Sequence, residues 1–369
     1  MKKRIGSVDG WRMIAALGVL YAHTWSLLHF PSLRIGGVNL MQVIALWGNG
    51  VQLFFVISGF CFYLVLSKQA TYDLDAAIGF WKKRWLRIAP AFYVACTVYA
   101  FCNYSALASN IGTRLFFNYT FLQNMVPNTE IAAHFWSLAV EWHFYLLLPF
   151  IFLLIKRLGV MGVVISILSI QIILNLFHYK GLLMPGDAWY YTIFCNIGHF
   201  AWGILIAYLF TTPTGVRFFS HPLSILAGLV VAYAGRLFFF TDFVTRMGSL
   251  GFVAQSIGPL FMSMGFAAMI LSCLESRILS AIFGNKVFSA LGRVSYSFYL
   301  WHFIVLQTVW DFCYKYIPRT ASGVLLVMML VLSILIPLSF LSYRLFESFY
   351  FRSRAKEKPV KKLDNATAR

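Results

Sequence analysis

The first apolar segment of this chain, WRMIAALGVLYAHTWSLLHF, carries the ionisable side chains Arg12 and His23 in its interior. Such groups are costly inside a membrane helix and are usually functional there. The two are eleven residues apart, close to three helical turns, so they project from one face, roughly 16 Å apart along the axis. That separation is too long for a close pair, and it suits two groups that hold different parts of one extended ligand.

A second group of charges, Lys83, Arg84 and Arg87, lies in the segment FWKKRWLRIAPAFY at residues 80–93. Arg84 and Arg87 stand at i and i+3 and therefore share a helix face. Clustered guanidinium groups suit two-pronged recognition of phosphate. Basic residues beside a membrane helix are also ordinary topology signals, so the spacing leaves both interpretations open.

Glu141 lies within the apolar segment HFWSLAVEWHFYLLLP at residues 134–149, together with His134 and His143. A carboxylate at such a depth is expected to face a partner or a wet cavity. Glu141 either orients a catalytic group or is a buried hydrogen-bonding residue. The sequence does not decide between these two roles.

His302 lies near the end of the segment LGRVSYSFYLWHF at residues 291–303, about two helical turns beyond Arg293. A single membrane histidine often does no more than bond a backbone carbonyl. Two such histidines with several basic residues at one membrane face are more typical of a reaction channel. In GVQLFFVISGF, the small residues Gly50, Ser58 and Gly59 favour close helix packing, with room for a narrow ligand as the alternative.

The composition indicates where these residues lie. Hydrophobic residues make up 60% of the chain, charged residues 11%, and the mean hydropathy is +0.76. Together with repeated apolar runs of about twenty residues, this predicts an all-α, polytopic transmembrane helical bundle. The net charge of +18 does not indicate nucleic-acid binding, because the basic residues are distributed by topology and not concentrated on one water-facing surface.

The apolar runs predict about ten spans, at residues 11–30, 40–66, 88–102, 133–155, 159–178, 190–211, 222–240, 248–274, 295–316 and 321–343. We expect both termini in the cytoplasm, because this orientation places most of the Lys and Arg residues inside, as the positive-inside rule requires. The exceptions are Arg34, Arg114, Lys180, Arg236, Arg246, Lys315 and Arg319.

We expect one membrane domain at residues 1–351, followed by a basic cytoplasmic tail at 352–369 that is too polar to fold alone. The first span resembles a signal peptide but has no convincing cleavage site, so we interpret it as a permanent helix. The six cysteines have no metal-ligand spacing, and we expect no metal. The loop at 103–132 is either a connector or a contact for an extracytoplasmic substrate.

Several of these segments resemble blocks of the acyltransferase type 3 family of integral-membrane O-acyltransferases. SVDGWRMIAALGVLYAH is similar to its N-terminal signature, with Asp9, Arg12 and His23 at the matching positions. KKRWLRIAP, GVQLFFVISGF, WSLAVEWHFYLLLP and LGRVSYSFYLWH resemble four further blocks in the expected order, and the resemblance covers residues 7–347. The chain departs from the pattern at Met13, at Trp142 and His143, and after Glu347, where the usual Pro is missing.

The resemblance implies transfer of an acetyl or other short acyl group from cytoplasmic acyl-CoA to a hydroxyl of a cell-surface carbohydrate or its lipid-linked precursor. It implies His23 as general base, supported by Arg12, Asp9 and Glu141. The donor site would be formed by Lys83, Arg84, Arg87 and His302. Acyl-CoA, most simply acetyl-CoA, would be a co-substrate with no permanently bound cofactor, and the bacterial cytoplasmic (inner) membrane would be the location.

Two other classes of protein fit some of these features. A transporter or flippase for a glycolipid or polyanion would use the histidines as proton relays, although no two-fold repeat of the kind many transporters have is visible. A non-catalytic membrane subunit of a glycan-assembly complex is the third interpretation. The sequence does not identify the acceptor, the acyl chain, the route by direct transfer or acyl-enzyme, or the oligomeric state.

Overall fold

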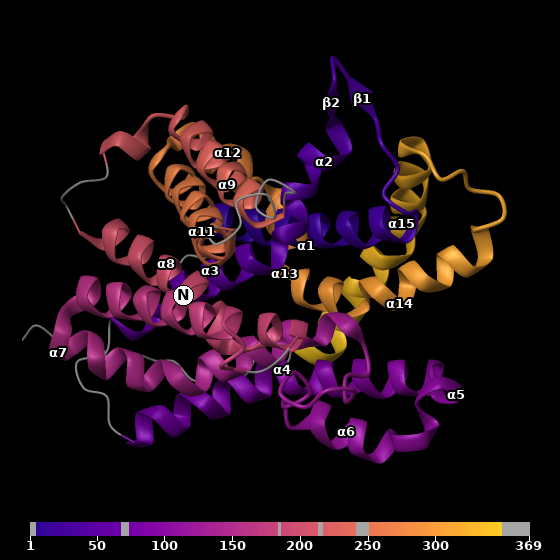
Figure 1. Ribbon diagram of the computed structural model, residues 1–369, viewed down its shortest axis with the longest axis horizontal. Coiled ribbons are helices and arrows are strands. Elements are labelled where there is room, and N and C mark those ends of the chain that lie inside the picture. Colours follow the sequence, from indigo (N-terminus) through magenta and orange to yellow (C-terminus); the bar gives the residue numbers. More distant parts are fainter. Residues whose placement is uncertain (1–4, 68–73, 184–185, 213–216, 241–250, 349–369) are drawn as a thin grey trace, which may run out of the picture.

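The computed structural model describes residues 5–67, 74–183, 186–212, 217–240 and 251–348. The described part is a bundle of helices with one small hairpin (Figure 1). Its long helices are α1 (Gly6–Leu27), α3 (Gly50–Leu66), α4 (Leu74–Cys102), α7 (Trp136–Tyr179), α8 (Ile193–Thr211), α9 (Ser224–Phe240), α11 (Gly251–Glu275), α14 (Ser295–Cys313) and α15 (Ala321–Ser342). The basic residues 2–4, Arg246 and the predicted tail at 352–369 lie outside the described residues.

Short elements connect the long helices. They are the antiparallel strands β1 (Arg34–Ile35) and β2 (Val38–Asn39), the helices α2 (Leu40–Ile44), α5 (Tyr104–Leu107), α6 (Ile111–Tyr119), α12 (Arg277–Phe283) and α13 (Lys286–Arg293), the 3-10 turns η1 (Ala45–Asn49), η2 (Ala108–Asn110), η3 (Ala133–Phe135), η4 (Gly186–Tyr191) and η5 (Arg217–Ser220), and the π-helical segment η7 (Tyr343–Glu347). The hairpin projects from the body of the bundle (Figure 1). The predicted loop at 103–132 is partly helical, since it contains α5, η2 and α6.

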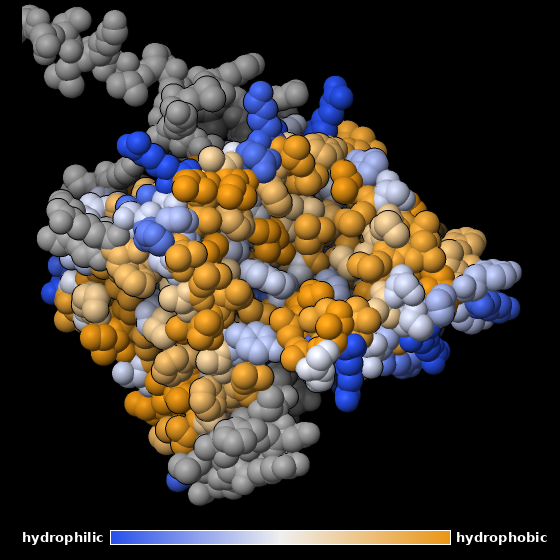
Figure 2. All heavy atoms as spheres, turned by 90° about the horizontal axis from the view of Figure 1, so that it is seen from above, coloured by the Kyte–Doolittle hydropathy of each residue, from blue (hydrophilic) through white to orange (hydrophobic). Residues whose placement is uncertain are grey.

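Six stretches of the described chain are helical, long and apolar enough to cross a membrane, so the prediction of an all-α multi-pass membrane protein is confirmed. They are Leu40–Leu66, Leu74–Cys102, Ala133–Tyr179, Ile193–Thr211, Ser256–Glu275 and Ala321–Glu347. Apolar side chains also cover most of the face in Figure 2, with hydrophilic residues toward its edges.

Each of the ten predicted spans coincides with helical structure, but the number ten stays a prediction. α9 is shorter than the six spanning stretches, and α1 and α14 are absent from them. Both of these helices carry polar side chains, such as Arg12 and His302. The predicted spans 133–155 and 159–178 lie on α7, which is broken at Gly159, where φ is 73°, a conformation that glycine adopts without strain.

The helices on which the polar motifs lie pack very closely. At Gly59 on α3, an added Cβ would lie 2.1 Å from the backbone oxygen of Phe200 on α8. At Gly203 on α8, it would lie 2.0 Å from the backbone oxygen of Val56 on α3. The two glycines therefore let α3 and α8 meet backbone to backbone, which confirms the packing interpretation of Gly59.

This packing predicts that Gly59→Ala destabilises the bundle, because the new methyl group overlaps a backbone atom that cannot rotate away. We expect a loss of about 1–3 kcal/mol in the free energy of unfolding, measured by thermal unfolding in detergent. Gly79→Ala on α4 is the control, because nothing lies within 4 Å of its added Cβ. Equal melting temperatures for Gly59→Ala and Gly79→Ala would contradict the role given to Gly59.

Candidate functional site

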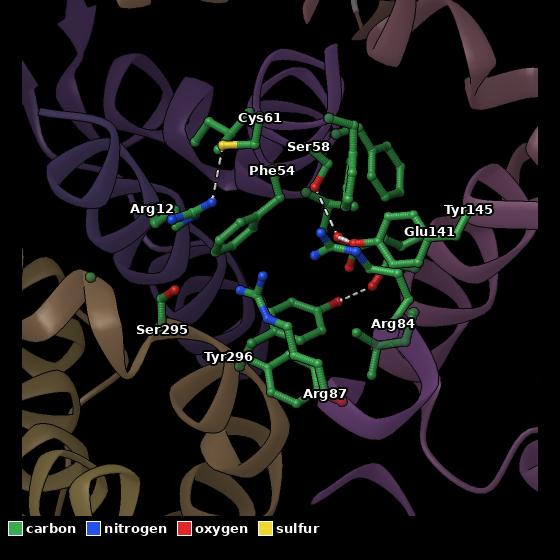
Figure 3. Close-up of a pocket in the computed structure, with 18 of the residues that line it drawn as sticks. Arg12, Phe54, Ser58, Cys61, Arg84, Arg87, Glu141, Tyr145, Ser295 and Tyr296 are labelled. Atoms are coloured by element: carbon green, nitrogen blue, oxygen red, sulfur yellow. Dashed lines mark hydrogen bonds between the residues drawn. The ribbon is translucent and has the colours of Figure 1, made fainter. Parts of the chain in front are cut away.

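A cavity of about 230 Å³ lies between the helices that carry the polar motifs. We call it the cationic cavity, because four arginines line it against two glutamates, an excess of two positive charges. Its charged lining residues are Arg12, Arg84, Arg87, Arg293, Glu141 and Glu347. Figure 3 shows Arg12, from α1, and Arg84 and Arg87, both from α4, pointing into the same space.

Arg84 and Arg87 bring the charge of α4 to this cavity. The Cζ atom of Arg84 lies 4.3 Å from the ring centroid of Phe62 and 5.3 Å from that of Phe80, while the side chain is buried. Stacking on aromatic faces stabilises a guanidinium group that has lost its water. Lys83, also predicted from the sequence, is exposed and is not among the residues that line the cavity.

Arg12 is held on α1 by Asp9. Its Nη1 donates to Asp9 Oδ1 at 2.9 Å, and its Nη2 lies 3.2 Å from Cys61 Sγ on α3. Asp9 is buried, and its backbone packs against Gly292, where an added Cβ would lie 1.9 Å from the Asp9 oxygen. The first and last sequence blocks therefore meet here and orient Arg12 toward the cavity.

Glu141 lines the same cavity from α7. Its Oε1 accepts a hydrogen bond from Ser58 Oγ at 2.8 Å and another from the hydroxyl of Tyr145. Two donors from two helices hold the carboxylate in place within the arginine-rich lining. Glu141 thus forms a hydrogen-bonded tie between helices and faces the cavity, while its orienting of a catalytic group stays a prediction.

His23 and His302 lie outside the cationic cavity, in a group of three histidines that we call the histidine cluster. The ring centroids of His23 and His302 are 5.3 Å apart, and those of His302 and His134 are 4.7 Å apart. Phe303 covers the cluster, with its centroid 5.3 Å from His23 and 5.6 Å from His134. The rings come from α1, α14 and η3.

The histidine cluster contains buried nitrogen atoms available to a ligand. His302 Nδ1 lies 2.6 Å from the backbone oxygen of Tyr299, and His134 Nε2 lies 3.3 Å from that of Leu300. The other nitrogens, His302 Nε2 and His134 Nδ1, are buried and have no hydrogen-bond partner among the described residues. Among all the residues that the structure describes, no group of His, Cys, Asp and Glu has the geometry to hold a metal ion.

Tyr299 separates the cationic cavity from the histidine cluster. Its side chain lines the cavity, and its ring centroid is 5.2 Å from that of His302 and 5.5 Å from that of His134. Its hydroxyl is 2.6 Å from Ser137 Oγ, on α7, and donates to the backbone oxygen of His134 at 2.9 Å. The two parts of the site are therefore neighbours on either side of one aromatic ring.

The structure brings together Arg12, Asp9, Arg84, Arg87 and Glu141 at or beside the cationic cavity, and His23 and His302 in the histidine cluster. Sequence reasoning assigned no role in a site to the further polar residues His134, Arg293, Tyr299 and Glu347, and it interpreted Ser58 as a small packing residue. Each lies in a sequence block already singled out, and that position was the signal that could have found them. His143 lies elsewhere on α7 and does not line the cavity.

Comparisons with known proteins agree with one another. Residues 5–341 match the family described as Acyltransferase domain. The acyltransferase MdmB of Streptomyces mycarofaciens is 25% identical over 329 residues, which cover 82% of this chain and 79% of that protein. A protein of Acidianus two-tailed virus, ORF330, provisionally named an acetyltransferase, is 25% identical over 310 residues, 82% of either chain.

A longer relative is SACOL0978 of Staphylococcus aureus (strain COL), provisionally named an O-acetyltransferase. It is 27% identical over 337 residues, which cover 83% of this chain. The match covers 51% of that protein, so the chain spans about half of its length. No solved structure shows significant similarity.

The buried pair of Arg12 and Asp9 leads to a double-mutant prediction. Asp9→Ala leaves the guanidinium of Arg12 without its carboxylate, and we expect a destabilisation near the lower end of about 3–5 kcal/mol, since Arg12 keeps 18% of its side chain exposed. Arg12→Ala with Asp9→Ala should cost less than the two single changes added together. Thermal unfolding in detergent measures all three variants.

The control for this cycle is Asp311→Ala, because Asp311 is exposed on α14, where such a change costs little. Strictly additive effects of Asp9→Ala and Arg12→Ala would show that the two side chains do not stabilise each other.

Proposed function

As a member of the acyltransferase type 3 family, this chain is a membrane acyltransferase, and we propose that its donor is acyl-CoA, most simply acetyl-CoA. We further propose that the acceptor is a hydroxyl of a cell-surface carbohydrate or its lipid-linked precursor. The observation that carries this proposal is the cationic cavity beside the histidine cluster, with Tyr299 between them. The names of the relatives support acetyl as the group transferred.

The cationic cavity has the chemistry that a coenzyme A donor needs. The phosphates of coenzyme A carry several negative charges, and arginines bind phosphate in two-pronged contacts. A volume of about 230 Å³ is smaller than the usual range for a whole ligand, about 300–1,000 Å³, so only part of the donor fits inside. In this proposal Arg84 and Arg87 hold phosphates near exposed Arg293 and Lys83, while the thin thioester arm passes inward toward Tyr299.

The histidine cluster supplies the base. The acceptor hydroxyl gives its proton to a ring nitrogen of His23, and its oxygen attacks the thioester carbonyl carbon. The C–O bond forms as the C–S bond breaks, and the departing CoA sulfur takes up a proton. General-base catalysis of this kind contributes about 10²- to 10⁴-fold in rate, and the apolar surroundings exclude the water that would hydrolyse the thioester.

His302 belongs to the donor side of this arrangement. Its Nδ1 is bound to the backbone of Tyr299, which lines the cationic cavity, while its ring faces His23. Arg12 and His23 lie on one helix, α1, at the two ends of the proposed path. Asp9 orients Arg12, and Glu141 fixes the α7 side of the donor cavity.

We also propose ten spans, both termini in the cytoplasm, and a location in the bacterial inner membrane. The distribution of Lys and Arg residues supports this orientation. It places Arg84 and Arg87 at the cytoplasmic face, where acyl-CoA is available.

Purified protein incubated with radiolabelled acetyl-CoA and surface glycan from cells that lack the chain tests the proposal. We expect a labelled ester on the glycan that mild base removes. A transporter or a non-catalytic subunit would form no ester, so an unlabelled glycan with stable, folded protein would overturn the proposed reaction.

His23→Ala should abolish acyl transfer, with kcat lowered by about 10²- to 10⁴-fold, because no base remains to take the hydroxyl proton. Expression and thermal stability should stay near those of the unmodified protein, since the side chain is only half-buried. His221→Ala, at an exposed position, is the control. Full turnover by purified His23→Ala protein would remove His23 from the mechanism.

Arg84→Ala and Arg87→Ala should each weaken CoA binding, since a hydrogen bond to a charged group is worth about 1.5–3 kcal/mol. Arg87→Lys should restore only part of the affinity, because Lys lacks the planar fork. Calorimetry on detergent-solubilised protein measures the dissociation constant. Lys82→Ala, at an exposed position outside the cavity, is the control, and unchanged affinity in both alanine variants would place the donor elsewhere.

A further inference from the structure

A second cavity, of about 430 Å³, is formed by η1, α3, η4, α8, α11 and both ends of α7. We call it the neutral cavity, because no Lys, Arg, Asp or Glu is among the described residues that line it. We propose that it binds the acceptor as an uncharged oligosaccharide. This inference rests on the proposed function. The residues that carry it are Asn49, Gln52, Trp136, Trp189, Tyr191 and Asn196.

The lining of the neutral cavity combines aromatic rings with amide and hydroxyl groups. The C–H faces of a pyranose ring pack on aromatic rings, whose faces carry partial negative charge. Amide side chains offer both donors and acceptors to sugar hydroxyls. Among the described residues no Lys or Arg lines this cavity, in contrast to the cationic cavity, and Arg236 beside it donates a hydrogen bond to Asn49 Oδ1. The two cavities therefore fit the two different substrates of one transfer.

The aromatic side chains of the neutral cavity are fixed before any ligand arrives. The ring of Trp189 stacks on His178 at 5.4 Å and 12°, and its indole N–H donates to Asn175 Oδ1 at 2.9 Å. The rings of Trp136 and Tyr191 are 5.2 Å apart. A platform that is already ordered loses little entropy on binding.

A third cavity, of about 300 Å³, borders the second, and Trp136 and Tyr191 line both. Gln123 and Asn124 line it and are buried. Their amide nitrogens donate to the backbone oxygens of Phe135 and Tyr191. Their oxygens, Gln123 Oε1 and Asn124 Oδ1, have no hydrogen-bond partner among the described residues.

Buried acceptors without a donor are costly, and hydroxyl groups of a ligand are suitable donors for them. Two adjacent cavities, both lined by Trp136 and Tyr191, offer room for more than one sugar. This is why we infer an oligosaccharide segment and not a single small alcohol.

The position of the neutral cavity relative to the reactive groups fits an acceptor site. The three parts of the site meet at the start of α7, where residues close in sequence belong to different parts. His134 belongs to the histidine cluster, Trp136 to the neutral cavity and Ser137 to the cationic cavity. The ring of Phe55, which lines the cationic cavity, is 6.2 Å from that of Trp136. Donor and acceptor would thus approach the histidine cluster from different sides.

The turn η1, which borders this cavity, packs against α1 beside His23. An added Cβ at Gly48 in η1 would lie 2.8 Å from Cβ of Ala22 on α1. Asn49, the next residue of η1, lines the neutral cavity, and His23 follows Ala22. The residue before the proposed base and the residue before a lining residue of the proposed acceptor site are therefore in close contact.

The first test uses Gln52→Ala and Tyr191→Ala in the full-length protein. The acceptor probe is a preparation of O-deacetylated oligosaccharides from the surface glycan of cells that lack the chain. We expect each variant to raise the KM for this probe by roughly 5- to 10-fold and to leave the CoA dissociation constant within about two-fold. The matched controls are Gln42→Ala and Tyr104→Ala, at exposed positions outside both cavities.

The second test reads the neutral cavity directly through Cys195, a free, half-buried cysteine in its lining. Methyl methanethiosulfonate modifies the unaltered protein, and mass spectrometry follows the peptide that contains Cys195. We expect the oligosaccharide probe to slow this modification several-fold and CoA to leave it unchanged. This test does not depend on catalysis.

The outcomes separate the two proposals. If the unmodified protein forms no ester from the labelled donor, the proposed reaction fails, and the Cys195 experiment still tests binding. If ester forms while Gln52→Ala and Tyr191→Ala keep the KM of the unmodified protein and Cys195 is not protected, the neutral cavity is not the acceptor site. Protection by CoA in place of the oligosaccharide would also overturn the assignment.

Discussion

A charged donor can enter an apolar helix bundle only where the bundle has already paired its own buried charges. The interaction on which this site depends most is the pair of Arg12 and Asp9 at 2.9 Å. It keeps a guanidinium at the cavity wall, where an unpaired charge would cost several kcal/mol. On α4, the stacking of Arg84 on Phe62 and Phe80 likewise stabilises a buried guanidinium group.

This pairing requires backbones that meet without side chains between them. Gly292 lets α13 contact the backbone of Asp9, and Gly59 and Gly203 do the same between α3 and α8. Ser58, beside Gly59, then reaches Glu141 on α7. The small residues thus set the distances over which the polar residues act, and Tyr299 divides the result into a cationic cavity and a histidine cluster. In the proposed mechanism the phosphates of the donor lie in the cationic cavity, and its thioester carbonyl lies on the side of the histidine cluster.

Much of the fold could be predicted from the sequence, because apolar runs and flanking charges fix where helices lie. The predicted spans 133–155 and 159–178 are separated in the sequence by Lys156 and Arg157, and the helix α7 is broken at this position, at Gly159. The gathering of Arg12, Arg84, Arg87 and Glu141 follows from their being costly in a membrane, which forces them toward a common interior.

The remaining site could not be read from the sequence, because it depends on contacts between distant segments. Tyr299 and Ser137 are 162 positions apart, and neither residue type is unusual in a membrane helix. His302, expected with the donor-binding residues, lies against His23 and His134 in the histidine cluster. Helix faces, which hydropathy does not determine, decide such placements.

The central claim is that donor and acceptor approach the histidine cluster from different sides, and in the proposed orientation, with the donor in the cytoplasm and a cell-surface acceptor, these are opposite sides of the membrane. Purified protein in sealed vesicles tests it, with its orientation read from labelling of Asp75→Cys, at the exposed start of α4, by a membrane-impermeant maleimide. Acetyl-CoA is supplied on one side and the deacetylated oligosaccharide on the other. The account predicts ester only when acetyl-CoA is on the side where Asp75→Cys reacts, and ester formed with acetyl-CoA confined to the opposite side would contradict it.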